Sequence, residues 1–305
     1  MVDLGRAIRS SMSTPSRVGV IGLGIIGARV AKNLRKAGFD VYVWNRTPKD
    51  EPQFVQSPRI LAETCQVLQI FVANDAAILE TIENLLAALT PQHLLIAHST
   101  ISPETISEIA TRIAPSGAHL IDAPFTGSKG AAEKGQLVYY VAADPADLER
   151  AKPVLEATSR HIVYFDNLGD ASLVKIATNL ITASIVQSLS EAVAITEKAG
   201  VDLNKLAEAI EYNACRSGVS DMKLPAIIKG DFEPNFSLTN MLKDSRLALQ
   251  LAEIFKLELP VTETVNQILA RADEKGWGAK DFAIISELVR GEVVLGHRKR
   301  RTLRV

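Results

Sequence analysis

Hydrophobic positions in the first half of the chain fall into short apolar runs, separated by stretches whose apolar residues have helical spacing. The helical stretches include Ile25–Ala37, Ala76–Leu89 and Pro103–Ile113. Strands that alternate with helices indicate a mostly parallel sheet covered on both faces. The apolar runs predict strands at Val18–Ile21, Val41–Trp44, Val67–Ala73, Leu94–His98, His119–Ile121 and Leu137–Ala142.

After Phe165 the pattern changes, and from about 170 to 290 it predicts helices alone. We therefore expect an α/β fold: a doubly wound Rossmann domain in residues 17–165, followed by an all-α domain in residues 166–292. We expect residues 1–16 to be a disordered or ragged N-terminus, with a transit peptide as the less favoured alternative. Residues 293–305 form a basic tail. The predicted helices are 171–199, Leu203–Asn213, Leu238–Phe255, Pro260–Lys275 and Lys280–Leu288.

Composition narrows the class of partner. The chain has 34 Lys and Arg against 35 Asp and Glu, which gives no whole-chain reason to expect nucleic acid or acidic lipid. No unbroken apolar run reaches the roughly 18 residues of a membrane span. The 2 cysteines and 5 scattered histidines provide neither a disulfide framework nor zinc-ligand spacing. We expect a cytoplasmic protein with a small-molecule ligand and no metal.

A glycine motif lies where an apolar strand meets a helix. In the pattern G-x-G-x-x-G the first glycine allows a tight turn, the second admits a pyrophosphate, and the third lets helix and strand pack closely. The helix N-terminus adds free N–H groups and positive potential. The flanking strand and helix favour dinucleotide binding over a glycine-rich turn without a ligand. The motif consists of Gly22, Leu23, Gly24, Ile25, Ile26 and Gly27.

The end of the second strand indicates which dinucleotide is bound. An NAD enzyme usually has Asp or Glu there to bind the ribose 2′-OH. This chain has Asn45, Arg46 and Thr47 instead, so a cation and neutral hydrogen-bonding groups face the position of a 2′-phosphate. We predict NADP(H). Asn74 and Thr100 follow other parallel strands and are expected at the same edge, in contact with the cofactor.

Four further blocks carry a resemblance. They are Asp122–Ser128 (DAPFTGS), Lys175–Asn179 (KIATN), Ser99–Thr100 and Lys243–Leu249 (KDSRLAL). With the glycine motif, they resemble the β-hydroxyacid dehydrogenase family, in the family's order and over roughly residues 17–290. The similarity is greatest to NADPH-dependent glyoxylate/succinic semialdehyde reductases. It implies a 6-phosphogluconate dehydrogenase-like fold and a homodimer or homotetramer formed through the helical domain.

The resemblance also implies roles for residues. Lys175 would be the general acid/base of a reversible hydride transfer between NADPH and a small aldehyde or keto acid, and Asn179 would orient it. Their i, i+4 spacing places both on one face of a helix, although spacing alone leaves a structural lysine equally open. Thr126, Gly127 and Ser128 would hold the substrate carboxylate, and Lys243 would contact the nicotinamide. An imine reductase of the same fold and a catalytically weak NADP-binding scaffold are the alternatives.

Three positions depart from the family pattern. Thr126 replaces a serine, which keeps the hydroxyl but narrows the pocket. Ala171 replaces a glycine and would be strained if its φ were positive. Ser220 stands where the glyoxylate reductases tend to have an aromatic residue. The departure at Ser220 bears on the choice of substrate more than on the reaction.

Overall fold

The computed structural model describes residues 17–291. Contacts divide the chain into two compact units, one ending at Lys175 and one beginning at Ile176. The predicted ragged start at 1–16 and basic tail at 293–305 lie outside the described residues.

An eight-stranded sheet forms the centre of the first unit, in the order β2-β1-β3-β4-β5-β7-β6, with β8 paired to β7. Strands β1 to β5 are parallel neighbours, whereas β7 runs antiparallel to β5 and β6. The doubly wound fold is therefore confirmed. The strands are β1 (Arg17–Ile21), β2 (Asp40–Trp44), β3 (Val67–Ile70), β4 (Leu94–Ala97), β5 (His119–Asp122), β6 (Phe125–Thr126), β7 (Leu137–Ala142) and β8 (Ser159–Phe165).

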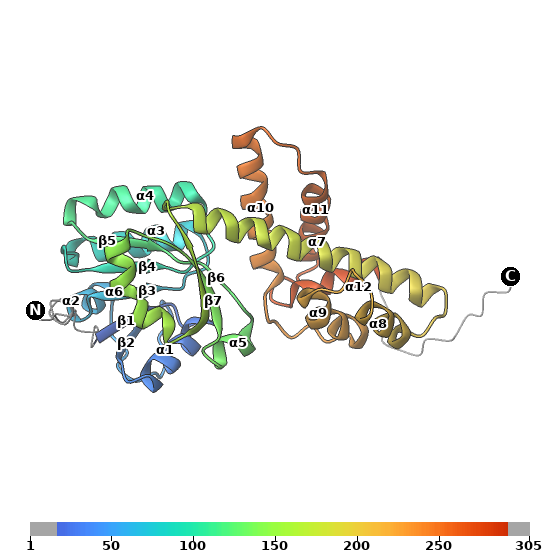
Figure 1. Ribbon diagram of the computed structural model, residues 1–305, viewed down its shortest axis with the longest axis horizontal. Coiled ribbons are helices and arrows are strands. Elements are labelled where there is room, and N and C mark those ends of the chain that lie inside the picture. The colour runs from blue at the N-terminus through green and yellow to red at the C-terminus, as the bar shows by residue number, and fades with distance from the viewer. Residues whose placement is uncertain (1–16, 292–305) are drawn as a thin grey trace, which may run out of the picture. The chain divides into compact units, whose positions relative to one another are not determined.

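Helices cover both faces of this sheet, because successive strand side chains point to opposite faces. One apolar core joins the sheet to α1, α5 and α6, and the other joins it to α2, α3 and α4. Figure 1 shows α4 and α1 on opposite sides of the strands. The helices are α1 (Gly27–Lys36), α2 (Pro58–Thr64), α3 (Asp75–Leu85), α4 (Pro103–Ile113), α5 (Lys129–Glu133) and α6 (Pro145–Glu156).

Strand register places the predicted ligand-binding residues at one edge of the sheet. The last residue of each strand pairs with the last residue of the next strand across the sheet, in the order β2, β1, β3, β4, β5. The segments that follow these strands therefore leave the sheet side by side. In an open α/β sheet this carboxyl edge is where ligands bind. The row of strand ends is Trp44, Ile21, Ile70, Ala97 and Asp122.

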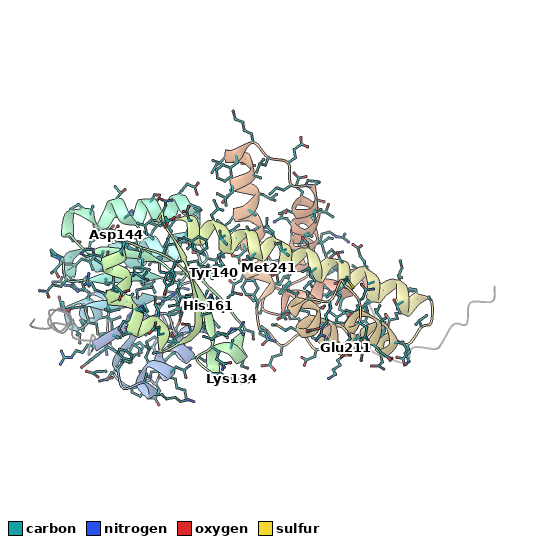
Figure 2. The ribbon with its side chains drawn as sticks, viewed as in Figure 1. Lys134, Tyr140, Asp144, His161, Glu211 and Met241 are labelled. Atoms are coloured by element: carbon teal, nitrogen blue, oxygen red, sulfur yellow. The ribbon has the colours of Figure 1, made fainter. Side chains whose placement is uncertain are left out.

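The second unit is helical, with one large apolar core and a smaller apolar cluster that includes Ile176 and Leu247. Met241, labelled in Figure 2, is fully buried in that core, and Phe236 and Phe282 pack edge to face with ring centroids 5.9 Å apart. Helix α7 begins in the first unit and continues into the second. The helices are α7 (Asp170–Lys198), α8 (Leu203–Glu211), α9 (Gly218–Lys229), α10 (Leu238–Phe255), α11 (Pro260–Glu274) and α12 (Ser286–Arg290).

Helix α7 differs from the sequence expectation in one respect. Within the described residues it is the one helix long and apolar enough to span a membrane by length and composition, and 44% of the window that passes is buried. The core helix of a soluble protein passes the same test, so the observation is weak evidence either way. Its polar residues, Lys175 and Asn179 among them, interrupt the apolar run.

Candidate active site

The glycine motif forms the turn between β1 and α1. Gly22 has a φ of +90°, and a Cβ there would overlap the Phe71 carbonyl oxygen; a Cβ on Gly27 would overlap the Gly22 carbonyl oxygen. Both glycines are therefore required by the fold itself. A Cβ on Gly24 would meet no atom within 4 Å. The fold leaves open space beside Gly24, which fits the close approach of a pyrophosphate.

The segment after β2 folds back onto this turn. Asn45 Oδ1 accepts a hydrogen bond from the Leu23 backbone N–H (2.9 Å), and Asn45 Nδ2 donates to the Thr47 carbonyl (2.7 Å). The predicted cofactor residues Asn45 and Leu23 are thus brought together, and Arg46 lies exposed between Asn45 and Thr47. Sequence reasoning missed Lys49, whose ammonium donates to the Leu23 carbonyl at 2.6 Å. Lys49 therefore brings a cation to the glycine turn, and Arg46 is the neighbour of Asn45, which is bonded to the same turn.

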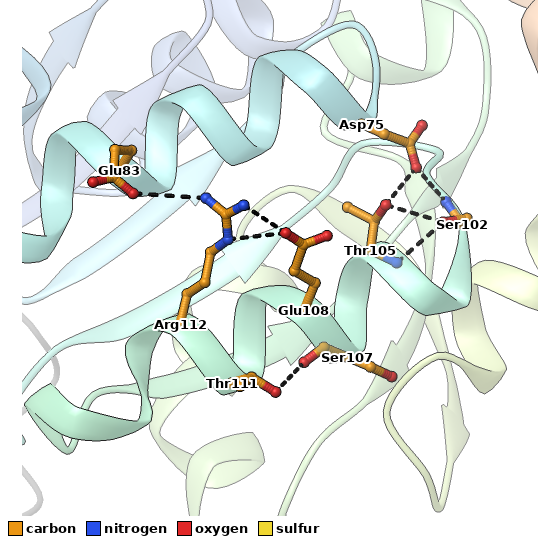
Figure 3. A network of polar contacts seen from close by, with 8 residues as sticks. All are labelled: Asp75, Glu83, Ser102, Thr105, Ser107, Glu108, Thr111 and Arg112. Atoms are coloured by element: carbon orange, nitrogen blue, oxygen red, sulfur yellow. Dashed lines mark hydrogen bonds and ion pairs between the residues drawn. The ribbon is translucent and has the colours of Figure 1, made fainter.

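The segments after β3 and β4 are bonded to each other. The Ser99 hydroxyl donates to the Val72 carbonyl (2.8 Å) and accepts from the Val72 N–H (3.1 Å). Asp75 Oδ1 accepts from the Ser102 N–H (2.9 Å) and the Thr105 hydroxyl (2.7 Å), as Figure 3 shows. These bonds fix the short turn that contains the half-buried Thr100.

Asn74 has a structural task at this edge. Its side-chain oxygen accepts from the Ala77 N–H at 2.9 Å and so caps α3. A cofactor contact by Asn74 stays a prediction. Asp75, its neighbour, holds the Thr100 turn through the bonds described above, a role that the sequence alone did not assign.

The predicted substrate segment lies between β5 and α5. Thr126 ends β6 and pairs with Val138 of β7, whereas Gly127 has a φ of +125° and Ser128 is the residue before α5. Ala123 lies at the start of this segment, and its carbonyl accepts a hydrogen bond from the His98 Nδ1–H at 2.7 Å. Burial lowers the pKa of His98 to about 3, so this imidazole is neutral and its role is to position the Ala123 backbone by a hydrogen bond.

The candidate catalytic residues lie on α7. Lys175 is 8% exposed and Asn179 is 7% exposed, and their helical spacing places them on one face. Asn179 Nδ2 donates to Asp244 Oδ2 at 2.6 Å, and the Lys243 ammonium lies 2.7 Å from Asp244 Oδ1. Asp244 is only 1% exposed, and an amide and a cation therefore replace the water that this carboxylate loses. Lys243 thus forms an ion pair with the residue that follows it, and its contact with the nicotinamide stays a prediction.

Two of the three departures have a structural explanation. Ala171 lies in the first turn of α7 and is absent from the positive-φ residues, so it carries no strain; the positive φ falls on Gly169, at +97°. The Ser220 side chain donates to the Ser217 carbonyl and accepts from the Ser217 N–H, and with Ser217 it forms the capping box of α9. Ser220 is therefore committed to starting a helix.

Family models cover both units. Residues 17–166 match the NAD-binding domain of 6-phosphogluconate dehydrogenase, and residues 169–289 match the NAD-binding domain of NADP-dependent 3-hydroxyisobutyrate dehydrogenase. The chain is 30% identical over 292 residues to glyoxylate/succinic semialdehyde reductase 2, chloroplastic, of Arabidopsis thaliana, covering 92% of this chain and 81% of the relative. The corresponding reductase 1 is 29% identical, with 90% of this chain and 98% of the relative covered.

Solved structures share the fold. The 3-hydroxyisobutyrate dehydrogenase of Mycobacterium tuberculosis has a TM-score of 0.82 at 24% identity, with 91% of this chain and all of that chain covered (100%). Psf3, solved in complex with NADP+ and 2-OPP, also has a TM-score of 0.82 at 24% identity, with 89% and 99% covered.

The fold and the family models define a nicotinamide-dependent oxidoreductase. The chain belongs to the β-hydroxyacid dehydrogenase family.

Proposed function

We propose that this protein is an NADPH-dependent reductase of small aldehyde or keto acids, of the glyoxylate or succinic semialdehyde type. The observation that carries the proposal is a buried lysine, Lys175, one helical turn from an amide that is itself bonded to a buried carboxylate. A lysine buried on an apolar helix is costly unless it has a partner or a task. The names of the two Arabidopsis relatives support the choice of substrate class.

Preference for NADPH follows from the charges beside the glycine turn. Arg46 and Lys49 bring two cations to the end of β2, and no carboxylate occupies positions 45–47. Arg46 offers a planar guanidinium for the 2′-phosphate, and Lys49 offers a compact charge. An Asp or Glu at the end of β2, which would bind the 2′-OH of NAD, is replaced here by Asn45.

The reaction then divides among the chain's residues. Bound NADPH supplies the hydride. Thr126, Gly127 and Ser128 hold the substrate carboxylate with hydroxyl and backbone N–H groups. The Lys175 ammonium donates a proton to the carbonyl oxygen, and in the reverse direction the neutral amine accepts the hydroxyl proton. Asn179, fixed by Asp244, keeps its amide oriented beside the lysine.

We also propose that the protein acts in the cytoplasm as a homodimer or homotetramer associated through the helical unit. Four large apolar side chains are exposed where α10 meets α11, and such a patch marks an interaction surface. They are Ile254 (55%), Phe255 (54%), Leu257 (58%) and Val261 (60%). Light scattering on wild type and on Phe255→Asp tests this, since a dimer should become lighter in the variant and an unchanged mass would contradict it.

Replacing the lysine tests the assignment. Lys175→Ala should abolish turnover of glyoxylate and succinic semialdehyde and leave NADPH binding intact. Lys198→Ala is the matched control, because Lys198 is exposed in the last turn of the same helix. Turnover in Lys175→Ala equal to that of Lys198→Ala would remove Lys175 from the mechanism. An imine reductase would turn over a cyclic imine instead, and a scaffold would bind NADPH without turnover.

A further inference from the structure

A fully buried carboxylate joins the end of β5 to the first turn of α7. Asp122 has no exposed area (0%), and neither has Ser172 (0%). The Ser172 backbone N–H donates to Asp122 Oδ2 at 2.9 Å, and the Ser172 hydroxyl donates to Asp122 Oδ1 at 2.7 Å. Both carboxylate oxygens are thus bonded by one residue, 50 positions further along the chain. We call this contact the Asp122–Ser172 joint.

The joint connects the two segments on which the proposed chemistry depends. Asp122 is the last residue of β5, and the substrate segment begins directly after it. Ser172 precedes Lys175 by three residues, which is about one turn of α7. The distance between the substrate segment and the lysine is therefore set by one contact and the short pieces of chain on either side of it.

The charge of Asp122 requires an explanation. Burying a carboxylate is costly, and an uncharged side chain could join a strand to a serine with less desolvation. Hydrogen bonds to an ionised oxygen are shorter and roughly twice as strong as neutral ones. Two such bonds on one carboxylate restrict both translation and rotation of the helix turn. The charge thus contributes rigidity where rigidity matters for a reaction.

We propose that Asp122 and Ser172 are positioning residues for the reduction: they fix the first turn of α7 on the end of β5, and so hold Lys175 at a set distance from the bound substrate. This inference rests on the proposed function, because it assumes that Lys175 is the proton donor.

The joint makes the reaction sensitive to acid. Burial is the largest influence and raises the pKa of Asp122 to about 6, whereas the two Ser172 bonds and the Gly169 backbone lower that pKa; the charge of Asp170, on the same turn, raises it. When the pH falls through about 6, the carboxylate is protonated and the charge-assisted bonds become weaker neutral ones. Turnover should fall with them. Ser172→Ala removes a bond that favours the ionised form, so its acid limb should move to higher pH.

The experiment compares wild type with Ser172→Ala, Asp122→Asn and a matched control, Ser190→Ala. Ser190 is fully buried on the same helix, and its hydroxyl donates within that helix to the Val186 carbonyl (2.7 Å). Turnover is measured from about pH 5 to pH 8, and hydrogen exchange is followed in the first turn of α7. Ser172→Ala should lose about 10- to 100-fold in kcat with little change in KM for NADPH, because misplacement by about 1 Å costs that much. Its first turn should exchange faster, and Asp122→Asn should lose the acid limb.

The outcomes separate the joint from the proposed function. An equal loss of kcat in Ser172→Ala and Ser190→Ala, or an acid limb that does not move in Ser172→Ala, would overturn the positioning role. Should Asp122→Asn fail to fold, Ser172→Ala still gives the answer. A wild-type protein without turnover on any acid overturns the proposed function and the positioning role with it. Exchange then decides whether the joint holds the helix at all, since unchanged exchange in Ser172→Ala would show that it does not.

Discussion

The open space beside Gly24 allows a cofactor-binding role of this residue to be tested separately from a structural role. Gly24 lies outside the positive-φ residues, and a Cβ there would meet no atom within 4 Å. Gly24→Ala should therefore fold normally and gain about 0.4–1 kcal/mol of stability, because alanine reduces the entropy of the unfolded chain. That corresponds to a rise in Tm of roughly 1–4 °C. If the pyrophosphate approaches the backbone at this glycine, the added methyl group should weaken NADPH binding at least about tenfold, or about 1.4 kcal/mol.

Thermal unfolding and fluorescence titration with NADPH measure the two effects independently. Gly218→Ala is the matched control, since a Cβ on Gly218, in the second unit, also meets no atom within 4 Å. It should gain similar stability and bind NADPH normally. Gly22→Ala should instead be destabilised by more than about 2 kcal/mol, because its φ of +90° and the Phe71 carbonyl both oppose a side chain. A Gly24→Ala protein that binds NADPH as tightly as wild type would refute the assigned path of the pyrophosphate.

Four further predictions follow from named contacts. Arg46→Ala and Lys49→Ala should each raise KM for NADPH about tenfold and leave KM for NADH nearly unchanged, as steady-state kinetics with both cofactors would reveal. Asp244→Asn removes the charge that holds Asn179 and should lower kcat about 10- to 100-fold, in line with the roughly 1.5–3 kcal/mol of a hydrogen bond to a charged group; single-turnover rates measure this. Asp75→Ala frees the Thr100 turn and should weaken NADPH binding several-fold while binding of 2′,5′-ADP, which lacks the nicotinamide, stays the same. The pKa of Asp122 is about 6 in the folded protein, against an ordinary value of 3.8. What this group adds to the free energy of unfolding is therefore complete below pH 3.8 and is lost as the pH rises through about 6. The free energy of unfolding of Asp122→Asn, which cannot titrate at this position, should not show that loss when it is measured across the same range.

Much of the fold could be predicted because the strong signals are local. The helices Pro103–Ile113 and Leu238–Phe255 have the predicted bounds, since each begins at a serine cap and keeps an apolar face. Strand β8 (Ser159–Phe165) was missed because it lies half exposed and lacks a continuous apolar run. Helices α6 and α9 were missed because each contains an internal proline, which normally ends a helical pattern.

The candidate site likewise contains parts that the sequence predicts and parts that it does not. The conformation of the glycine turn was predictable because it depends on neighbours in the sequence, whereas the cofactor contacts of this turn and of the residues after β2 stay predictions. Lys49 and Asp75 were not assigned their contacts, because Leu23 and the Thr100 turn lie on other strand ends that meet only in the sheet. Asn179 and Asp244 are 65 positions apart, and their hydrogen bond depends on the packing of α7 against α10.

The most direct test is the loss of NADPH absorbance with glyoxylate, succinic semialdehyde, tartronate semialdehyde and a cyclic imine in parallel, repeated with NADH. The account predicts turnover of at least one of the three acids, faster with NADPH than with NADH. NADPH binding without turnover of any acid, or turnover of the imine alone, would contradict the proposal that Lys175 serves a semialdehyde reductase.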